Sequence, residues 1–229
     1  PLYAVRLQDR IQKGYFGMKI LFCAYRNWAL NVYNSIRSKC PHVSLVTTTK
    51  QFDEITQTNS FDVTILLGWS WIVSDEYVSS NYTIVAHPSD LPNYAGGSPI
   101  QNQIIDGLEK SKVTLFKATA QTDGGPILYK ENISLRGNLQ DVFYHIEHAT
   151  TSLLIKFFNH YPNIPETKQI SHDTKKRRTP KMSEIKLEDF TNMTAKELYN
   201  KIRCLQNPYP NAFVSCKNNT ILYLTGAKL

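Results

Sequence analysis

The chain has 229 residues, of which 41% are hydrophobic and 11% aromatic, enough apolar side chain for one large core and a small addition. Its net charge of +7 favours anionic partners, although five positive charges lie in KKRRTPK at 175–181, which a solvated linker would explain equally well. The four cysteines form no C-x-x-C pair, and the longest apolar run, 63–73, is too short to cross a bilayer. These features argue against a disulfide framework, a zinc ribbon and a membrane protein, and we expect a soluble protein in the cytoplasm.

The first 17 residues precede Met18, which opens MKILFCAY in the way that a natural start precedes a buried first strand. We therefore expect residues 1–17 to be an N-terminal extension or a remnant of cloning. From Met18 onward, apolar runs rich in Val, Ile, Leu and Phe alternate with stretches long enough for helices, and they lie at 19–25, 43–49, 63–69 and 83–89. This alternation predicts an α/β fold with a mainly parallel sheet that is covered on both faces.

The second half of the chain predicts further elements in order. Runs at 112–119 and 126–134, joined by a Gly-bearing turn, predict a hairpin added to the sheet, and 139–161 has the apolar spacing of a long helix. The polar, Pro-containing stretch 161–181 indicates a linker, followed by a short helix at 194–205 and a possible hairpin at 212–226. We expect a main domain over 18–165, and a linker with a small C-terminal subdomain over 166–229.

The stretch HPSDLPNYAGGSPIQ, residues 87–101, follows the fourth predicted strand. Ligands of open parallel sheets bind at the carboxyl ends of the strands, which is where His87 falls. Ser98, Pro99 and Gln101 are typical of a capped helix start, and Gly96 and Gly97 would let the backbone approach a ligand closely. The stretch predicts a binding site, although a histidine with a purely structural role fits the spacing equally well.

Two motifs in this region carry a family resemblance. HPSDLPNYAGGSPIQNQIIDG (87–107) resembles the H-x-S-x-L-P-x-[YF]-x-G-x-x-P signature of the folate-dependent formyltransferases, and TLFKATAQTDGGPILYKENI (114–133) is similar to their T…D-x-G-x-I segment. The resemblance implies a Rossmann-like catalytic core and 10-formyltetrahydrofolate as the formyl donor.

The later part of the chain bears on the acceptor. RRTPKMSEIKLED…PYPNAF (177–213) resembles the segment that follows the catalytic domain in methionyl-tRNA formyltransferases and in nucleotide-sugar N-formyltransferases. The tRNA enzymes continue into a β-barrel domain, whereas this sequence stops at Leu229 after one predicted hairpin, so the sugar branch fits better. The implied function is formylation of a nucleotide-linked deoxyamino sugar, with dTDP as the expected nucleotide, in the synthesis of lipopolysaccharide O-antigen or another surface polysaccharide.

The chemistry of formyl transfer sets the expected catalytic roles. The amine attacks as the free base and the carbonyl oxygen gains negative charge, so the site needs an oxyanion donor and a group that relays a proton. The resemblance gives these roles to His87 and Asp123, although Asp123 could also be an ordinary Asp-Gly turn residue. The family has an Asn two residues before the His, where this chain has Val85. Asn102 is the first candidate to replace it and Asn93 the second; either could instead be a cap or loop residue.

The resemblance also indicates binding residues. Folate is expected over the loop after the third strand, although the tryptophans of this loop could equally belong to the hydrophobic core. The cofactor-binding candidates are Gly68, Trp69, Ser70, Trp71, Ile72 and Gly124. The substrate-binding candidates supply cations, an aromatic face and backbone groups: Tyr94, Gly96, Gly97, Ser98, Lys176, Arg177 and Arg178, with Lys175 in the same basic pool. No metal site is expected, because His145 and His148 have no Cys or carboxylate pattern beside them.

Other functions stay open on the sequence. A methionyl-tRNA formyltransferase-like enzyme or a formyltetrahydrofolate hydrolase would keep the same two motifs. A basic nucleic-acid-binding protein would explain the charge but would not need them, and no nucleic-acid-binding motif is recognisable. We expect small-molecule partners, a nucleotide sugar and folate, with no nucleic acid and no membrane. A homodimer is compatible with the sequence.

Overall fold

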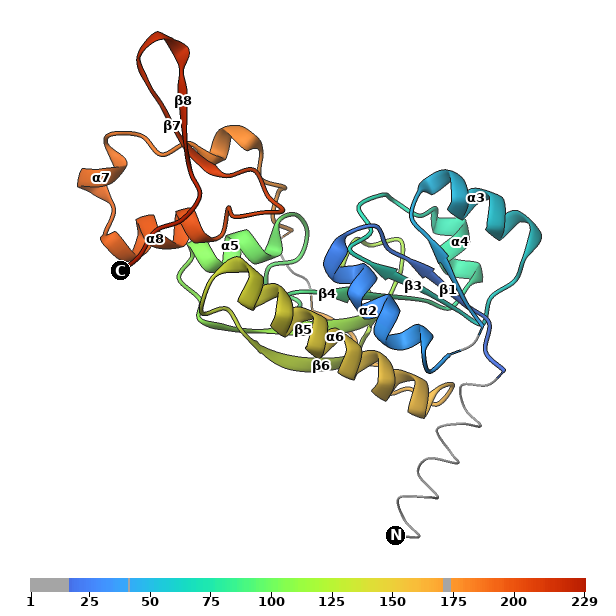
Figure 1. Ribbon diagram of the computed structural model, residues 1–229. Helices are drawn as coiled ribbons and strands as arrows, with labels where there is room; N and C mark the ends of the chain where they lie inside the picture. Colours follow the sequence, from blue (N-terminus) through green and yellow to red (C-terminus); the bar gives the residue numbers. More distant parts are fainter. Residues whose placement is uncertain (1–16, 41, 171–173) are drawn as a thin grey trace.

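Six strands form the central sheet in the order β2-β1-β3-β4-β5-β6 (Figure 1). The computed structural model describes residues 17–40, 42–170 and 174–229, so the predicted extension at 1–17 lies outside the described residues except for Gly17. The first four strands run parallel, which confirms the predicted mainly parallel α/β fold. The strands are β1 (Ile20–Cys23), β2 (Val43–Val46), β3 (Val63–Leu67), β4 (Thr83–His87), β5 (Lys110–Lys117) and β6 (Ile127–Ser134).

Helices cover both faces of this sheet, because alternate residues of its buried strands point to opposite sides. From β1, Ile20 and Phe22 pack into the core that includes α2 (Asn27–Arg37) and α6 (Leu139–His160). Leu21 and Cys23 pack on the other side, where α3 (Thr49–Thr58) contributes Phe52 and α4 (Asp75–Ser80) contributes Tyr77. Figure 1 shows α2 and α6 side by side, and the two helices are in contact.

The long helix predicted at 139–161 is α6, and it begins with a capping box. Asn138 accepts from the backbone N–H of Asp141, whose carboxylate accepts from the N–H of Asn138 in return. The helix buries ten side chains along one stripe, and it ends at His160, two residues before Pro162. Proline disfavours helical backbone in the residue before it, which accounts for this end point.

The predicted hairpin is confirmed as β5 and β6, and its loop takes an unexpected path. Since β5 runs antiparallel to β4, with Ile84 opposite Lys117, the loop at 118–126 leaves the sheet beside the start of β4. The loop must therefore fold back along β4 to approach His87 at the other end of that strand. A side chain on Gly125 would meet the carbonyl oxygen of Lys117 at 1.8 Å, so only glycine allows this return.

The stretch predicted as a linker, 161–181, pairs with the core in two places. Thr167 and Ile127 exchange two backbone hydrogen bonds of 2.8 Å, and Lys175 forms a bridge with Gly96. Residues 171–173 of this stretch lie outside the described residues. At these two places, backbone groups of the stretch are bonded to the sheet and to the loop after β4.

The remaining elements form a small annex beside α5 (Pro99–Ile105), as Figure 1 shows. The short helix predicted at 194–205 is α8, which packs on α5, and the predicted last hairpin is the two-stranded sheet of β7 and β8. The annex consists of η1 (Pro180–Ser183), α7 (Asp189–Asn192), α8 (Ala195–Arg203), β7 (Ala212–Ser215), η2 (Lys217–Asn219) and β8 (Ile221–Leu224). In the described part of the chain, the helices are all too short or too polar to cross a membrane.

A buried arginine joins the annex to the core. Arg203 is 4% exposed, and its Nη1 donates to the carbonyl oxygens of Leu135 at 2.7 Å and Gly137 at 3.0 Å. Its Nε donates to the side chain of Asn200 at 2.8 Å. Burial lowers the pKa of this guanidinium, so the hydrogen bonds must offset a desolvation cost.

Replacing this arginine tests how strongly the annex is held. Arg203→Met would leave two carbonyl oxygens unpaired at about 1–3 kcal/mol each, so we expect the free energy of unfolding to fall by roughly 2–6 kcal/mol. Urea denaturation followed by circular dichroism measures this loss, with the exposed Lys217→Met as control. A loss within about 0.5 kcal/mol of the control, the usual range for surface substitutions, would contradict the role of Arg203.

Candidate active site

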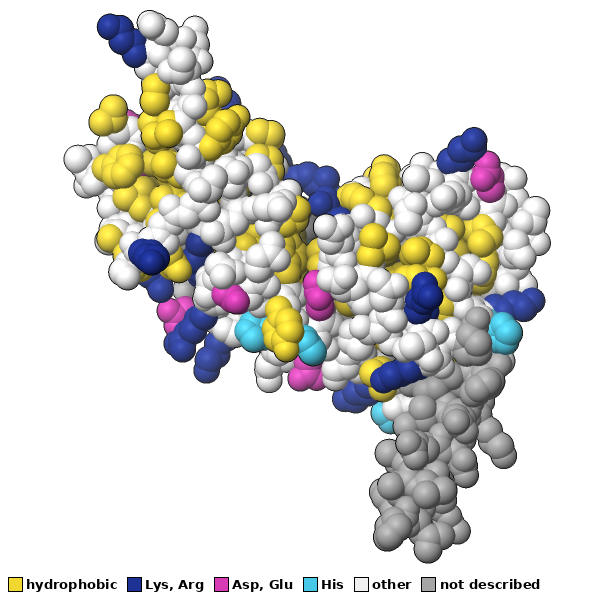
Figure 2. Space-filling view, in the orientation of Figure 1, with side chains coloured by type: hydrophobic (Ala, Val, Ile, Leu, Met, Phe, Trp, Pro, Cys, Tyr) yellow, Lys and Arg dark blue, Asp and Glu magenta, His cyan; other side chains and the backbone are white. Residues whose placement is uncertain are grey.

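A cleft of about 660 Å³ opens at the carboxyl ends of the parallel strands, where the loops after β1, β3 and β4 gather. The β5–β6 loop, the start of α5 and parts of 174–183 also line it. Figure 2 shows the surface hollowed between two lobes, with Lys or Arg side chains at the edge of the hollow. Its volume lies in the range of about 300–1,000 Å³ that is usual for small-molecule sites.

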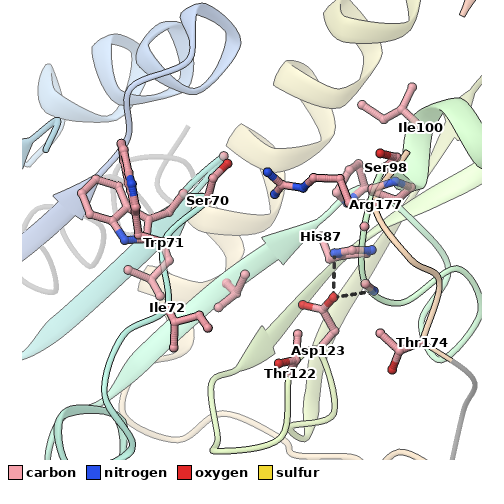
Figure 3. Close-up of a pocket in the computed structure, with 18 of the residues that line it drawn as sticks. Ser70, Trp71, Ile72, His87, Ser98, Ile100, Thr122, Asp123, Thr174 and Arg177 are labelled. Carbon is pink, nitrogen blue, oxygen red and sulfur yellow. Dashed lines mark hydrogen bonds and ion pairs between the residues drawn. The ribbon is translucent and has the colours of Figure 1, made fainter. Parts of the chain in front are cut away.

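His87 lies in this cleft at the end of β4, with 7% of its surface exposed. Its Nε2 is 3.0 Å from the carbonyl oxygen of Tyr94. A carbonyl oxygen only accepts, so Nε2 carries a hydrogen and donates it. On the other side of the ring, Nδ1 is 3.5 Å from Oδ2 of Asp123, as the dashed line in Figure 3 marks. The hydrogen bond to Tyr94 fixes the orientation of the ring, and the carboxylate of Asp123 pairs with Nδ1 when the imidazole is protonated.

Asp123 reaches His87 from the loop that folds back along β4. Its backbone has a φ of 52°, a left-handed conformation that Asp adopts more readily than most residues. Its Oδ2 accepts the backbone N–H of Gly96 at 2.8 Å. The Nε2 of Gln169 donates to the carbonyl oxygens of Asp123 at 2.8 Å and Gly125 at 2.6 Å, so the formerly predicted linker holds the turn in place.

An aromatic wall lies on the β3 side of the cleft. The rings of Trp69 and Trp71 are 4.7 Å apart, and Tyr25 packs against Trp71 at the same distance. The hydroxyl of Tyr25 donates to the Oγ of Ser70 at 2.6 Å, which anchors the loop. Trp71 is 41% exposed and Ile72 is 97% exposed, so this wall presents apolar surface that a flat ligand would cover.

Three arginines line the same cleft: Arg26, Arg177 and Arg178. Among the residues that the structure describes, none of them forms an ion pair with an acidic side chain. Figure 3 shows the side chain of Arg177 extending toward the β3 side, above His87. Unpaired guanidinium groups that converge on a cleft are suited to an anionic ligand.

Comparison with known proteins agrees with this geometry. Residues 41–149 match the sequence profile described as formyl transferase. This part of the chain is therefore similar to formyl transferases. The chain is 30% identical over 167 residues to the methionyl-tRNA formyltransferase of Rickettsia prowazekii (strain Madrid E), an alignment that covers 71% of this chain and 54% of the relative. The chain thus spans about half the length of the curated relatives it matches.

Solved structures share the formyltransferase fold. A methionyl-tRNA formyltransferase from Clostridium thermocellum is 24% identical with a TM-score of 0.76, over 90% of this chain and 96% of that one. A 4-N formyltransferase from Francisella tularensis is 18% identical with a TM-score of 0.73, over 93% and 99% of the two chains. HypX from Aquifex aeolicus, determined in complex with tetrahydrofolic acid, is 19% identical with a TM-score of 0.71, over 86% and 36%. Tetrahydrofolic acid is the deformylated form of the donor that is expected from the sequence.

Most of the predicted site residues line the cleft: His87, Asp123, Gly68, Trp69, Ser70, Trp71, Ile72, Gly96, Gly97, Ser98, Arg177 and Arg178. Asn102, Asn93, Gly124 and Lys176 do not. The Nδ2 of Asn102 donates to the carbonyl of Gly97 at 3.0 Å, and Asn93 is exposed on the other side of its loop. Neither asparagine therefore presents its amide to His87.

The ring of Tyr94 also lies outside the cleft, because a φ of 55° turns this residue away. Its hydroxyl donates to Asp106 at 2.9 Å, and burial together with this hydrogen bond raises the pKa of Tyr94 to about 12. Tyr94 contributes its backbone carbonyl to His87 instead of an aromatic face. The prediction that its side chain binds substrate was therefore wrong.

The glycines at 96 and 97 have a different role from the predicted one. A side chain on Gly97 would meet the backbone of Arg177 at 2.4 Å, and one on Gly96 would meet Thr174 at 2.4 Å. The backbone that approaches these glycines is the chain's own: Gly97 donates to the carbonyl of Lys175 at 2.7 Å, and Lys175 donates to that of Ala95 at 2.8 Å.

The helix start at α5 also differs from the prediction. Pro99 is its first residue as predicted, but Ser98 has a φ of 53° and its side chain caps no N–H of the helix. Its Oγ instead accepts the backbone N–H of Arg178 at 3.1 Å. The predicted capping box with Gln101 is absent, because a left-handed Ser98 does not have the extended backbone that this cap requires.

Sequence reasoning missed three residues of the site: Arg26, Gln101 and Gln169. Arg26 was open to prediction, since it follows the carboxyl end of β1, where ligands of parallel sheets bind. Gln101 was interpreted as a capping residue and Gln169 as part of a linker. No pattern in the sequence distinguishes these amides from ordinary polar residues.

The contact between Gly97 and Arg177 can be tested by steric crowding. Gly97→Ala should displace residues 174–178 and speed trypsin cleavage after Lys175–Arg178 by about tenfold or more, with a stability loss of roughly 1–3 kcal/mol from overpacking. Gly124→Ala is the control, since the atoms nearest to its new methyl belong to the side chain of Gln121 and not to the backbone. Equal cleavage rates in both variants would show that this contact does not hold the basic segment.

Proposed function

We propose that this protein transfers the formyl group of 10-formyltetrahydrofolate to the amine of a nucleotide-linked deoxyamino sugar. The observation that carries the proposal is the buried pair of His87 and Asp123 between an aromatic wall and unpaired arginines in one cleft. The match of residues 41–149 to the formyl transferase profile supports the reaction class. In this reaction the bond from the amine nitrogen to the formyl carbon forms, the bond from N10 breaks, and the amine proton ends on N10.

The cleft fits the donor. The donor supplies the activated formyl group, and it combines a flat bicyclic ring with a carboxylate-bearing tail. Trp69 and Trp71 offer flat apolar surface next to Gly68, whose φ of 59° turns the backbone at the start of this loop. These residues would hold the ring, and the guanidinium of Arg26 at the cleft edge is suited to the anionic tail.

The His87–Asp123 pair can manage the proton of the amine. When the imidazole is neutral, Nε2 donates to Tyr94 and Nδ1 holds the free electron pair. Nδ1 then accepts the proton, and the carboxylate at 3.5 Å stabilises the imidazolium that forms. We therefore assign His87 the role of base, instead of the oxyanion donor expected from the sequence.

A nucleotide sugar as acceptor is supported by the size and charge of the cleft. Arg177 extends over it from a backbone fixed at Gly97, and a diphosphate needs only two or three such cations. A tRNA is bound over a broad basic surface, with an affinity that falls steeply with salt.

Methionyl-tRNA is the second candidate acceptor. The observation that favours it is the 30% identity to a methionyl-tRNA formyltransferase, together with a net charge of +7. The two acceptors differ in their response to salt, since only a polyanion releases many counterions on binding.

The assignment of the pair predicts the effect of two substitutions. His87→Ala and Asp123→Asn should each lower turnover by about 100–1,000-fold, as loss of a general base or of an electrostatic partner does. Tetrahydrofolate release measures turnover, and thermal unfolding checks the fold. His42→Ala and Asp53→Asn, both at exposed positions, serve as controls. Near-normal turnover in a folded variant would remove that residue from the mechanism.

The acceptor is tested by asking which amine causes tetrahydrofolate release. We expect release with a dTDP-linked deoxyamino sugar, a rate that depends weakly on salt, and a KM for the sugar that rises about tenfold in Arg177→Ala because a charge-assisted contact worth about 1.4 kcal/mol is lost. Lys176→Ala is the matched control, since it removes the adjacent charge from a side chain that does not line the cleft.

Other outcomes of this assay would replace the proposal. Formylation of methionyl-tRNA with no turnover of any amino-sugar nucleotide would establish the second candidate. Release of tetrahydrofolate without any acceptor would indicate a hydrolase.

In a double variant, Arg177→Ala with Arg178→Ala, we expect the affinity for the nucleotide sugar to be lost more than the rate of the chemical step.

A further inference from the structure

Gln101 presents an unused amide in the cleft. It lies in the first turn of α5, lines the cleft together with His87 and Val85, and is 6% exposed. Its Oε1 is buried without a hydrogen-bond partner, and no protein partner of its Nε2 is found in the described part of the chain. A buried carboxamide without partners costs free energy, so its retention at a cleft indicates a ligand that supplies them.

Neighbouring amides show how unusual this is. On the same helix, Asn102 donates to the carbonyl of Gly97, and Gln103 donates to those of Pro88 and Pro99. Gln103 also accepts from the hydroxyl of Ser111. Their hydrogen bonds tie α5 to the end of β4 next to His87. In the described part of the chain Gln101 makes no such bond, although only 6% of its surface is exposed.

The formyl group of the proposed donor would be a hydrogen-bond partner for this amide. A formyl oxygen gains negative charge as the amine attacks, and hydrogen-bond donors aimed at it lower the barrier. His87 has no hydrogen to spare, since Nε2–H donates to Tyr94 and a proton on Nδ1 faces Asp123. Val85 on β4 is apolar and also lines the cleft. An additional N–H donor is therefore needed.

We propose that Gln101 is this donor: its carboxamide NH₂ binds the formyl oxygen and stabilises the negative charge that develops there. Rotation about the last side-chain torsion brings either end of the carboxamide to the ligand, so the amide can present N–H groups to the cleft. The assignment deepens the proposed function, because it requires a formyl group bound beside His87.

Kinetic measurements separate this role from binding. Gln101→Leu should lower kcat by about 100-fold or more with KM for the donor changed less than about threefold, as expected for an interaction made mainly in the transition state. Gln101→Glu is close in shape, and it should be inactive at neutral pH but recover part of its rate at acidic pH, where the protonated acid can donate. Gln57→Leu is the control, because it removes an exposed amide on α3, outside the cleft, and should leave kcat unchanged.

A spectroscopic measurement tests the contact without turnover. 10-Formyl-5,8-dideazafolate with ¹³C in its formyl group is bound in the absence of acceptor, and the carbonyl stretch is recorded by infrared difference spectroscopy. We expect a shift to lower frequency in the wild type, loss of most of this shift in Gln101→Leu, and its retention in Gln57→Leu. The wild-type spectrum keeps the test decisive even where a Gln101 variant fails to fold.

The possible outcomes separate the assignment of Gln101 from the proposed acceptor. A wild-type carbonyl stretch at its frequency in water, or a folded Gln101→Leu with kcat within threefold of wild type, overturns the assignment of Gln101. A shifted band that depends on Gln101, in a protein that formylates no amino-sugar nucleotide, would refute the proposed acceptor and support the assignment.

A rescue experiment adds Val85→Asn to Gln101→Leu. This double variant should recover part of the rate, since it returns an amide to the same cleft.

Discussion

The backbone of residues 94–97 is the constraint on which the candidate site depends. The carbonyl of Tyr94 accepts from His87, the N–H of Gly96 donates to Asp123, and the N–H of Gly97 donates to Lys175. One short loop therefore orients His87, the carboxylate of Asp123 and the segment that carries Arg177. Positive φ angles at Tyr94 and Gly96 aim these backbone groups in different directions, which regular secondary structure could not do.

The sheet and its helices were predictable because buried apolar side chains form recognisable runs and spacings in the sequence. Apolar runs mark the four parallel strands, and the stripe of α6 has helical spacing over its whole length. The sequence also indicated His87, since a Pro/Gly-rich loop follows a strand end there. The fold-back of the β5–β6 loop was not predictable, because it depends on one glycine packed against the carbonyl of Lys117.

The errors in the predicted site have local causes. Gly96 and Gly97 were expected to face a ligand, and the sequence cannot say which backbone fills the space that glycine leaves. The ring of Tyr94 was placed in the cleft, but a single φ angle turns it toward Asp106. Gln101 was interpreted as half of a capping box; a left-handed Ser98 cannot form that cap, which leaves the amide free to line the cleft.

The unpaired arginines link ligand binding to the position of the basic segment. Arg26 belongs to the core, whereas Arg177 comes from a segment held by the glycines of the loop after β4. Both guanidinium groups line the cleft, and in the described residues neither has an acidic partner that would offset the repulsion between their like charges. An anion between them would replace repulsion by attraction. Anything that weakens the contact at Gly97 must then weaken anion binding, and by linkage a bound anion must strengthen that contact by the same free energy.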